Sequence, residues 1–224
     1  FSQVKNQYAD LGIDVEQALT TLANTPISLH CWQGDDVGGF ETGAGELSGG
    51  LAVTGNHPGK ARSLSELRQD LDQVLDLLPG THRLNLHAIY GDFQGEKVDR
   101  DAITIDHFQS WIDWAKSHGI GMDFNPSCFS HDKAGSGFTL SSPDAGIRDF
   151  WIEHCQRARS IAADMGKQLG SPAVTNVWVP DGMKDNPADR QGYRHGVDQA
   201  TRQPRGRPLP GAGVSQHQAQ GQSG

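Results

Sequence analysis

The sequence predicts an α/β fold with a parallel sheet, because short apolar segments alternate with longer segments of helical periodicity. Gly or Pro stands at most of the junctions, as is typical of turns between strands and helices. The pattern fits about four βα units, followed by a segment that is poor in apolar residues. We therefore expect one folded domain and a tail.

The first unit begins with helical periodicity. Apolar residues recur at three- or four-residue steps from Val4 to Leu22, which predicts an amphipathic helix that Gly12 breaks in two. After Pro26, residues 27–32 form a short, half-apolar segment that predicts a buried strand. A glycine-rich stretch without periodicity then runs from residue 33 to about residue 62, and such a long loop in a compact domain is usually functional or disordered.

The second unit has clear helix boundaries. Ser63 and Glu66 have the spacing of a capping box, an apolar face follows, and Pro79 with Gly80 stops the helix. Residues 83–90 predict the second strand.

Two further units repeat the cycle. Asp106 is expected to cap a helix that ends at Gly119, and residues 120–124 predict the third strand. A long helix is expected to start at Pro143, and residues 173–179 predict the fourth strand.

Four such units fit either half of a closed barrel or an open doubly wound sheet, which periodicity alone does not separate. Residue chemistry favours the barrel, because polar and aromatic residues gather at the carboxyl ends of the strands, where barrel active sites are assembled. These residues are Trp32, His87, Phe124 with Asn125, and Trp178 with Asp181. We therefore expect an incomplete TIM (β/α)8 barrel, consisting of roughly the first four βα units and occupying residues 1–190.

Residues 191–224 are expected to be a disordered C-terminal tail, because Gly, Gln, Arg and Pro dominate them. Their few apolar side chains cannot offset the roughly 1–2 kcal/mol that ordering each backbone residue costs. The segment could be an interaction tail or an RNA-binding Arg/Gly segment. We favour an out-of-frame or mis-predicted gene end, because the fifth barrel strand is due here.

The composition is that of an ordinary globular protein, with 35% hydrophobic and 21% charged residues. A net charge of −8 argues against a nucleic-acid partner, which requires a surplus of Lys and Arg. Three widely spaced cysteines indicate free thiols in a reducing cytoplasm rather than disulfides or a zinc site. Neither a membrane span nor a signal peptide is expected. Because Phe1 lies inside a predicted helix, we expect the N-terminus to be incomplete.

Taken singly, the candidate functional residues are ambiguous. Residues 55–61 resemble a phosphate loop only faintly, since the glycine spacing is wrong and neither Ser nor Thr follows Lys60. Asp35 and Asp36 could serve acid–base chemistry or a metal, but a turn or helix cap explains them at least as well. A lone histidine within an apolar strand, such as His87, is more often a hydrogen-bonded core residue than a base.

Taken together, the strand-end residues indicate a sugar site. Trp32 and Trp178 are core aromatics by default, but an indole face also packs against the C–H groups of a sugar. The imidazole of His87 can donate a hydrogen bond to a ring or chain hydroxyl. A shared position at one end of the sheet favours a common pocket.

Four segments resemble the L-rhamnose isomerase family. They are HCWQGDDVGGFE at 30–41, LNLHAIY at 84–90, MDFNPSCFSH at 122–131 and VWVPDGMKD at 177–185. Together they span most of the chain up to about Arg190, and the first and last are long and unusual strings. The resemblance implies aldose–ketose isomerisation of L-rhamnose to L-rhamnulose by a metal-assisted hydride shift, as part of rhamnose catabolism.

The resemblance also implies roles for single residues. Trp32 and Trp178 match the apolar walls of the sugar site, and Phe124 could complete them. His87 matches a histidine that contacts the sugar near its ring oxygen and assists ring opening, which makes it the expected catalytic residue. Lys184 is left unassigned, because the family's reactive lysine belongs to a later strand.

The resemblance further implies two divalent ions, with Mn²⁺ at the catalytic position and ligands on later strands, so this chain is expected to contain no metal ligand. Without that Lewis acid, and with unpaired edge strands, we expect the chain alone to be inactive and poorly stable. The expected partner is a small-molecule sugar, in a homotetramer for full-length relatives, with neither nucleic acid nor membrane.

Two alternatives stay open. One is another sugar or sugar-phosphate isomerase or epimerase on a TIM barrel. The other is a non-catalytic binding module that uses the loop at 33–62 and the tail.

Overall fold

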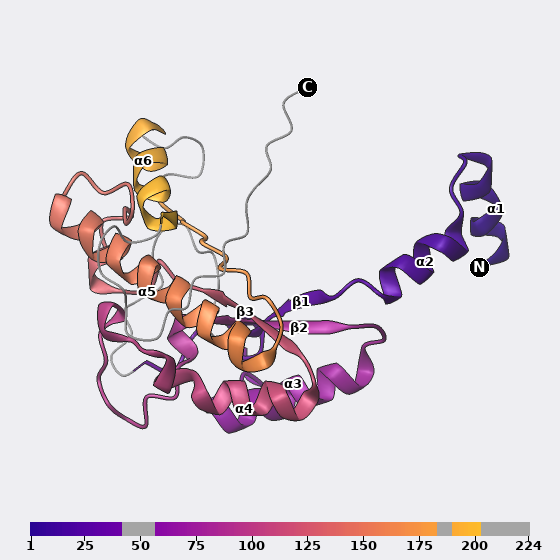
Figure 1. The fold of residues 1–224 in the computed structure, drawn as a ribbon, viewed down its shortest axis with the longest axis horizontal. Helices are drawn as coiled ribbons and strands as arrows, with labels where there is room; N and C mark the ends of the chain where they lie inside the picture. The colour runs from indigo at the N-terminus through magenta and orange to yellow at the C-terminus, as the bar shows by residue number, and fades with distance from the viewer. Residues whose placement is uncertain (42–56, 183–189, 203–224) are drawn as a thin grey trace.

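The computed structural model describes residues 1–41, 57–182 and 190–202 (Figure 1). The described strands are β1 (Ile27–His30), β2 (His82–His87) and β3 (Gly121–Asn125). The described α-helices are α1 (Ser2–Asp10), α2 (Val15–Ala23), α3 (Leu64–Leu77), α4 (Gln109–His118), α5 (Ala145–Leu169) and α6 (Arg190–Thr201). None of these helices has the length and apolarity needed to cross a lipid bilayer.

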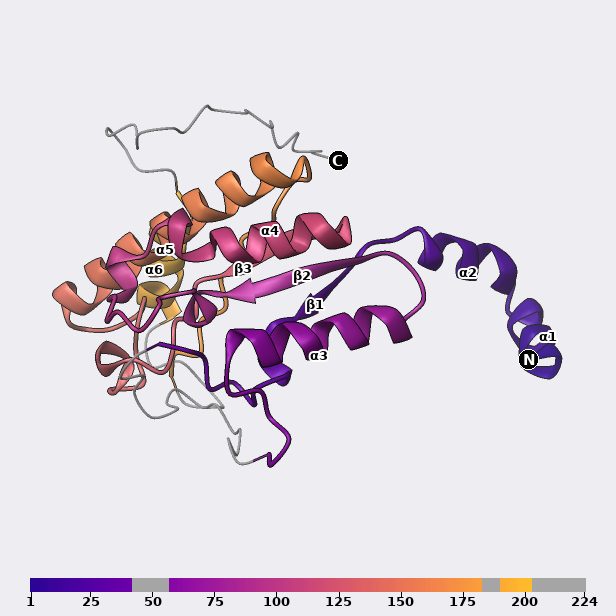
Figure 2. The same ribbon diagram turned by 90° about the horizontal axis from the view of Figure 1, so that it is seen from below.

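The strands form a parallel three-stranded sheet in the order β1-β2-β3, which confirms the predicted α/β class. His30 on β1 lies opposite Asn85 on β2, and His87 on β2 lies opposite Asn125 on β3. Helix α3 links β1 to β2 and α4 links β2 to β3, and both run alongside β2 in Figure 2. The carboxyl ends of all three strands therefore meet at one edge of the sheet.

The main apolar core lies between the sheet and its helices. Leu84 and Leu86 of β2 and Met122 and Phe124 of β3 are almost fully buried there, together with Trp111 of α4. Because side chains alternate between the two faces of a strand, the intervening residues point to the opposite face.

The predicted fourth strand is reduced to a single parallel bridge, between Thr175 and Phe124. The Phe124 amide donates to the Val174 carbonyl at 2.9 Å, and the Asn176 amide donates to the Phe124 carbonyl at 2.8 Å. The chain then continues to Asp181, whose carboxylate accepts hydrogen bonds from the loop between β3 and α5. Among the described residues, pairing between this segment and β3 is limited to that one bridge.

Most helix boundaries follow the expected capping chemistry. Ser63 caps α3 by accepting a hydrogen bond from the amide three residues on. Gly119 and Gly170 end α4 and α5 in the left-handed conformation, with φ of 63° and 62°. The prediction that Asp106 caps the third helix is wrong, because a 3-10 turn capped by Thr104 precedes α4.

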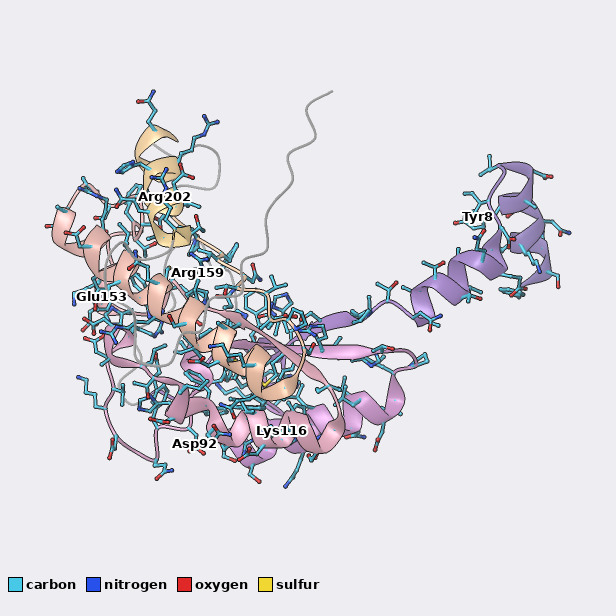
Figure 3. The ribbon with its side chains drawn as sticks, viewed as in Figure 1. Tyr8, Asp92, Lys116, Glu153, Arg159 and Arg202 are labelled. Atoms are coloured by element: carbon cyan, nitrogen blue, oxygen red, sulfur yellow. The ribbon has the colours of Figure 1, made fainter. Side chains whose placement is uncertain are left out.

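Helices α1 and α2 form an arm that stands away from the sheet (Figure 1). The predicted break between them lies at Gly12, whose φ of 78° favours glycine. Neither helix has a buried residue, and the apolar stripe predicted from the sequence is exposed, as at Leu11 and Leu22. Tyr8 belongs to this stripe and is labelled in Figure 3.

Helix α6 occupies a stretch predicted to be disordered, so that prediction is wrong up to residue 201. Ala200 is fully buried in a second apolar cluster, and Arg159 of α5 donates to the last carbonyl of the helix. Gly196 permits close contact with the backbone of Leu140, where a Cβ atom would overlap. Small residues allow this helix to pack closely against its neighbours. A prediction based on the number of large apolar residues does not detect such packing. Residues 203–224 lie outside the described residues.

Candidate active site

The face of the sheet opposite the core carries polar side chains. They alternate with the core residues along each strand. They are Ser28 and His30 on β1, Arg83, Asn85 and His87 on β2, and Asp123 and Asn125 on β3. Each strand thus ends at its carboxyl edge with a polar residue on this face.

An ion pair ties the middle of this face together. The Arg83 guanidinium binds the Asp123 carboxylate through two contacts of 2.9 and 3.0 Å. The same carboxylate accepts hydrogen bonds from Ser28 Oγ at 2.6 Å and from the Val174 amide at 2.8 Å. Burial alone would raise the pKa of Asp123, but these hydrogen bonds outweigh it and hold the pKa below its ordinary value. The segment that leads to Trp178 is therefore anchored on β3.

An aromatic cluster lies at the carboxyl edge of the sheet. Trp32, in the turn after β1, has its ring centroid 5.1 Å from that of His87 and 6.0 Å from that of Trp178. Phe129, in the loop after β3, lies 5.6 Å from Trp178 and 6.3 Å from His87. His87 is fully buried whereas Trp178 is 36% exposed, so the cluster leads from the interior to the surface.

His87 is a neutral imidazole within this cluster. Burial, together with the smaller effects of the nearby His30 and Arg100, lowers its pKa to about 3. At neutral pH its ring can therefore donate one hydrogen bond and accept another. Its Nε2 lies 3.4 Å from Nδ1 of His30, while its own Nδ1 is buried and has no hydrogen-bond partner among the described residues.

The structure brings together three of the four site residues predicted from the sequence, namely Trp32, His87 and Trp178. Phe124 lies on the other face of the sheet, where its ring packs 4.9 Å from that of Phe108. The alternation along β3 contains this information, because the polar residues on either side of Phe124 occupy the site face.

Two residues that contact the predicted ones, His30 and Phe129, are not predicted from the sequence. Phe129 lies in a loop without periodicity, between Ser127 and Ser130, which both have positive φ values. No periodic pattern in the sequence could place it. His30 could have been found, since it ends β1 on the face that carries His87.

A second ion pair, in which the arginine is fully buried, holds the loop that carries Phe129. Arg100 is 1% exposed and binds both carboxylate oxygens of Glu41. Its guanidinium also donates to the carbonyls of Ser127 and Phe129. His154 of α5 in turn contacts the Arg100 carbonyl, at 2.6 Å from Nδ1. The backbone on both sides of Phe129 is thereby fixed.

Asp35 and Asp36 serve the turn after β1. Asp35 is buried and accepts hydrogen bonds from the Gly39 amide at 2.6 Å and the Tyr90 hydroxyl at 2.5 Å. Burial raises the pKa of Asp35, although these hydrogen bonds oppose the rise. Asp36 has a left-handed φ of 57°. These features support the turn interpretation over acid–base chemistry.

No group of three or more His, Cys, Asp or Glu side chains that could hold a metal ion occurs within residues 1–41, 57–182 and 190–202. The residues described here therefore do not fit the divalent ions that the sequence resemblance implies, and no step below depends on one. Lys184, which the sequence left unassigned, lies outside the described residues.

The parallel βα sheet defines an α/β protein, and its carboxyl edge gathers two tryptophans, a phenylalanine and a neutral histidine. The chain matches the family model of L-rhamnose isomerase (RhaA) over residues 1–203. It is 56% identical to L-rhamnose isomerase of Shigella flexneri serotype 5b (strain 8401) and 57% identical to that of Citrobacter koseri, each over 186 residues. The chain belongs to the L-rhamnose isomerase family.

The two matches cover 83% of this chain and 44% of each relative. The chain thus spans less than half the length of these curated relatives.

Proposed function

We propose that this chain forms the sugar-binding part of an L-rhamnose isomerase, which converts L-rhamnose to L-rhamnulose. The observation that supports this most directly is the cluster of Trp32, His87 and Trp178 at the carboxyl edge of the sheet. That edge carries the active site in TIM barrels. The three strands and the bridge at Thr175 correspond in this proposal to the first four βα units of a (β/α)8 barrel.

Each residue of the cluster has a task that its chemistry suits. The indoles of Trp32 and Trp178 pack against the C–H faces of the sugar, and Phe129 extends this wall. His87, neutral at working pH, gives one proton to the ring oxygen as the C1–O5 bond breaks, and a proton from the C1 hydroxyl restores it. The sugar opens to its chain form with no net change in protons.

The later hydrogen shift between C1 and C2 requires groups other than those described. A divalent ion, expected to be Mn²⁺, would act as the Lewis acid that polarises the carbonyl. The described residues do not fit such an ion, so we assign its ligands to none of them.

The proposal extends to the setting of the enzyme. We place it in the cytoplasm, because all three cysteines are free thiols, as expected in a reducing compartment. We propose a homotetramer for the full-length enzyme and the sugar L-rhamnose as its small-molecule partner.

A chimaeric enzyme tests this function. Residues 1–190 of this chain replace the matching segment of the Shigella flexneri relative, and rhamnulose formation from L-rhamnose is measured with Mn²⁺. We expect the chimaera to isomerise L-rhamnose in preference to mannose and xylose, and the isolated 224-residue chain to show no turnover. A folded chimaera without activity on L-rhamnose would refute the proposal.

A matched pair of variants ties the activity to the cluster. Trp178→Ala removes a sugar wall and should raise KM about tenfold, because stacking on an aromatic face contributes roughly 1 kcal/mol or more. Trp114→Ala removes an indole on α4 that instead donates a hydrogen bond to Asp72, and it should leave KM unchanged. Equal effects of the two substitutions on KM would argue against a sugar site at Trp178.

A further inference from the structure

His30 and His87 form a pair across neighbouring strands. Each is the last residue of its strand, β1 and β2, and both lie on the polar face of the sheet. His30 stands opposite Asn85 in the register, so His87 is its diagonal neighbour, two residues further along. Their ring centroids lie 5.7 Å apart at 64°, with Nδ1 of His30 3.4 Å from Nε2 of His87.

Trp32 holds the two imidazoles in this arrangement. Its ring centroid lies 5.3 Å from that of His30 and 5.1 Å from that of His87, so one indole contacts both. His30 is exposed to solvent whereas His87 is fully buried. His30 is therefore the solvent-side member of the pair.

The pair can share one proton in two ways. If His30 donates, the proton of His87 sits on Nδ1, which is buried and has no hydrogen-bond partner among the described residues. If His87 donates from Nε2, only the lone pair of its Nδ1 is left unpaired. A buried N–H without an acceptor is the rarer and costlier defect, so the second arrangement is favoured.

We propose that His30 is a positioning residue for the proposed ring-opening step, and that it fixes the tautomer of His87 with the proton on Nε2. The hydrogen bond made by one imidazole nitrogen decides which tautomer is present. The Nε2–H tautomer carries its donor at the site side, where the sugar ring oxygen replaces His30 Nδ1 as acceptor. The other charged or titratable groups near His87 are Arg100, the Cys31 thiol, which contacts its backbone, and the Tyr90–Asp35 pair. Among the described residues, none of them forms a hydrogen bond with Nε2.

Imidazole NMR on the full chain, labelled with ¹⁵N-histidine, measures the tautomer directly. We expect the His87 signals of the unmodified chain to be those of the Nε2–H form at neutral pH. His30→Asn keeps an acceptor oxygen close to the position of Nδ1 and should preserve this form. His30→Phe keeps a ring but lacks an acceptor, and it should give a mixture of tautomers, while the control His82→Phe at the start of β2 should change nothing.

The same variants are then assayed in the chimaera, because this inference rests on the proposed function. We expect kcat/KM for L-rhamnose to fall about tenfold in His30→Phe and to stay within about twofold in His30→Asn, as general acid–base catalysis requires. An Nδ1–H form in the unmodified chain, or an unchanged tautomer in His30→Phe, would overturn the role of His30. An inactive unmodified chimaera would instead overturn the function and leave the NMR result standing.

Discussion

Substituting Arg100 by Leu should destabilise the folded chain more than any surface change. The side chain of Arg100 is 1% exposed and that of its partner Glu41 is 10% exposed, so the substitution leaves a carboxylate buried without its counter-charge. The carbonyls of Ser127 and Phe129 lose a donor as well. Removing one partner of a buried ion pair typically costs about 3–5 kcal/mol, and we expect a loss in this range.

Urea unfolding of the purified chain, followed by tryptophan fluorescence, measures the loss as a change in the midpoint at constant slope. The double variant Arg100→Leu with Glu41→Leu is the informative control. Because it removes both charges, it should be more stable than Arg100→Leu alone by about 1–3 kcal/mol. A loss below about 1 kcal/mol in the single variant, or a double variant that is simply additive, would show that this pair does not anchor the loop.

Three further predictions concern the rest of the described structure. Asp123→Asn should make stability depend less on pH in the acid range. The fold holds the pKa of Asp123 below its unfolded value near 4, so the ionised carboxylate stabilises the fold above that value. This stabilisation is lost as the pH falls through the pKa of Asp123 in the folded chain, and the Asn variant lacks it throughout. Melting temperatures between pH 3 and 7 measure this, and an unchanged acid limb would contradict it. Gly34→Ala should destabilise the chain by about 1–3 kcal/mol in urea, because a Cβ there would overlap Leu67, whereas Gly95→Ala meets no neighbouring atom and reports only the strain of a φ of 83°. The hydrogen bond with Cys155, together with burial, raises the pKa of the Cys128 thiol. The other two cysteines are buried as well, so a thiol reagent should label none of the three until urea unfolds the chain. Rapid labelling of the native chain would contradict this.

Periodicity and capping signals were sufficient for the central βα units. The segments at β1, β2 and β3 were short and apolar between Gly or Pro, and helix α3 carried both a cap and an apolar face. The fourth strand had the same local pattern, yet only Thr175 pairs with β3. Whether a segment pairs with its neighbour along its whole length depends on its tertiary contacts, which the local sequence does not specify.

Sequence reasoning placed part of the candidate site for a clear physical reason. His87 ends β2, and Trp32 lies in the turn after β1. Parallel strands bring their carboxyl ends to one edge of the sheet irrespective of loop conformation. Phe124 also stands near a strand end, but the two-residue alternation along β3 places it in the helix-facing core rather than in the site. The position of Phe129 depends on contacts made by residues distant in the sequence, which periodicity does not reveal.

Packing explains the two remaining differences. The apolar stripe of α1 and α2 predicted amphipathic helices correctly, but it did not show that nothing in the described structure covers them. For helix α6 the prediction was disorder, yet the helix is packed, because Gly196 and Ala200 allow close contact with few large side chains. Helix propensity and apolar count describe a helix by itself, whereas tertiary packing decides whether it is held.

The positions of Trp178 and Phe129 depend on two arginines, the half-buried Arg83 and the buried Arg100, rather than on the sheet alone. Arg83 holds the Asp123 carboxylate, which accepts the Val174 amide and so fixes the segment leading to Trp178. Arg100 fixes the carbonyls around Phe129 in the same way. A sugar wall must keep its place within about half an ångström to bind one sugar selectively, and a charged, multiply hydrogen-bonded anchor holds a loop more firmly than apolar contacts of the same area. Weakening either anchor should therefore loosen sugar binding at the proposed site before it disturbs the pairing of the three strands.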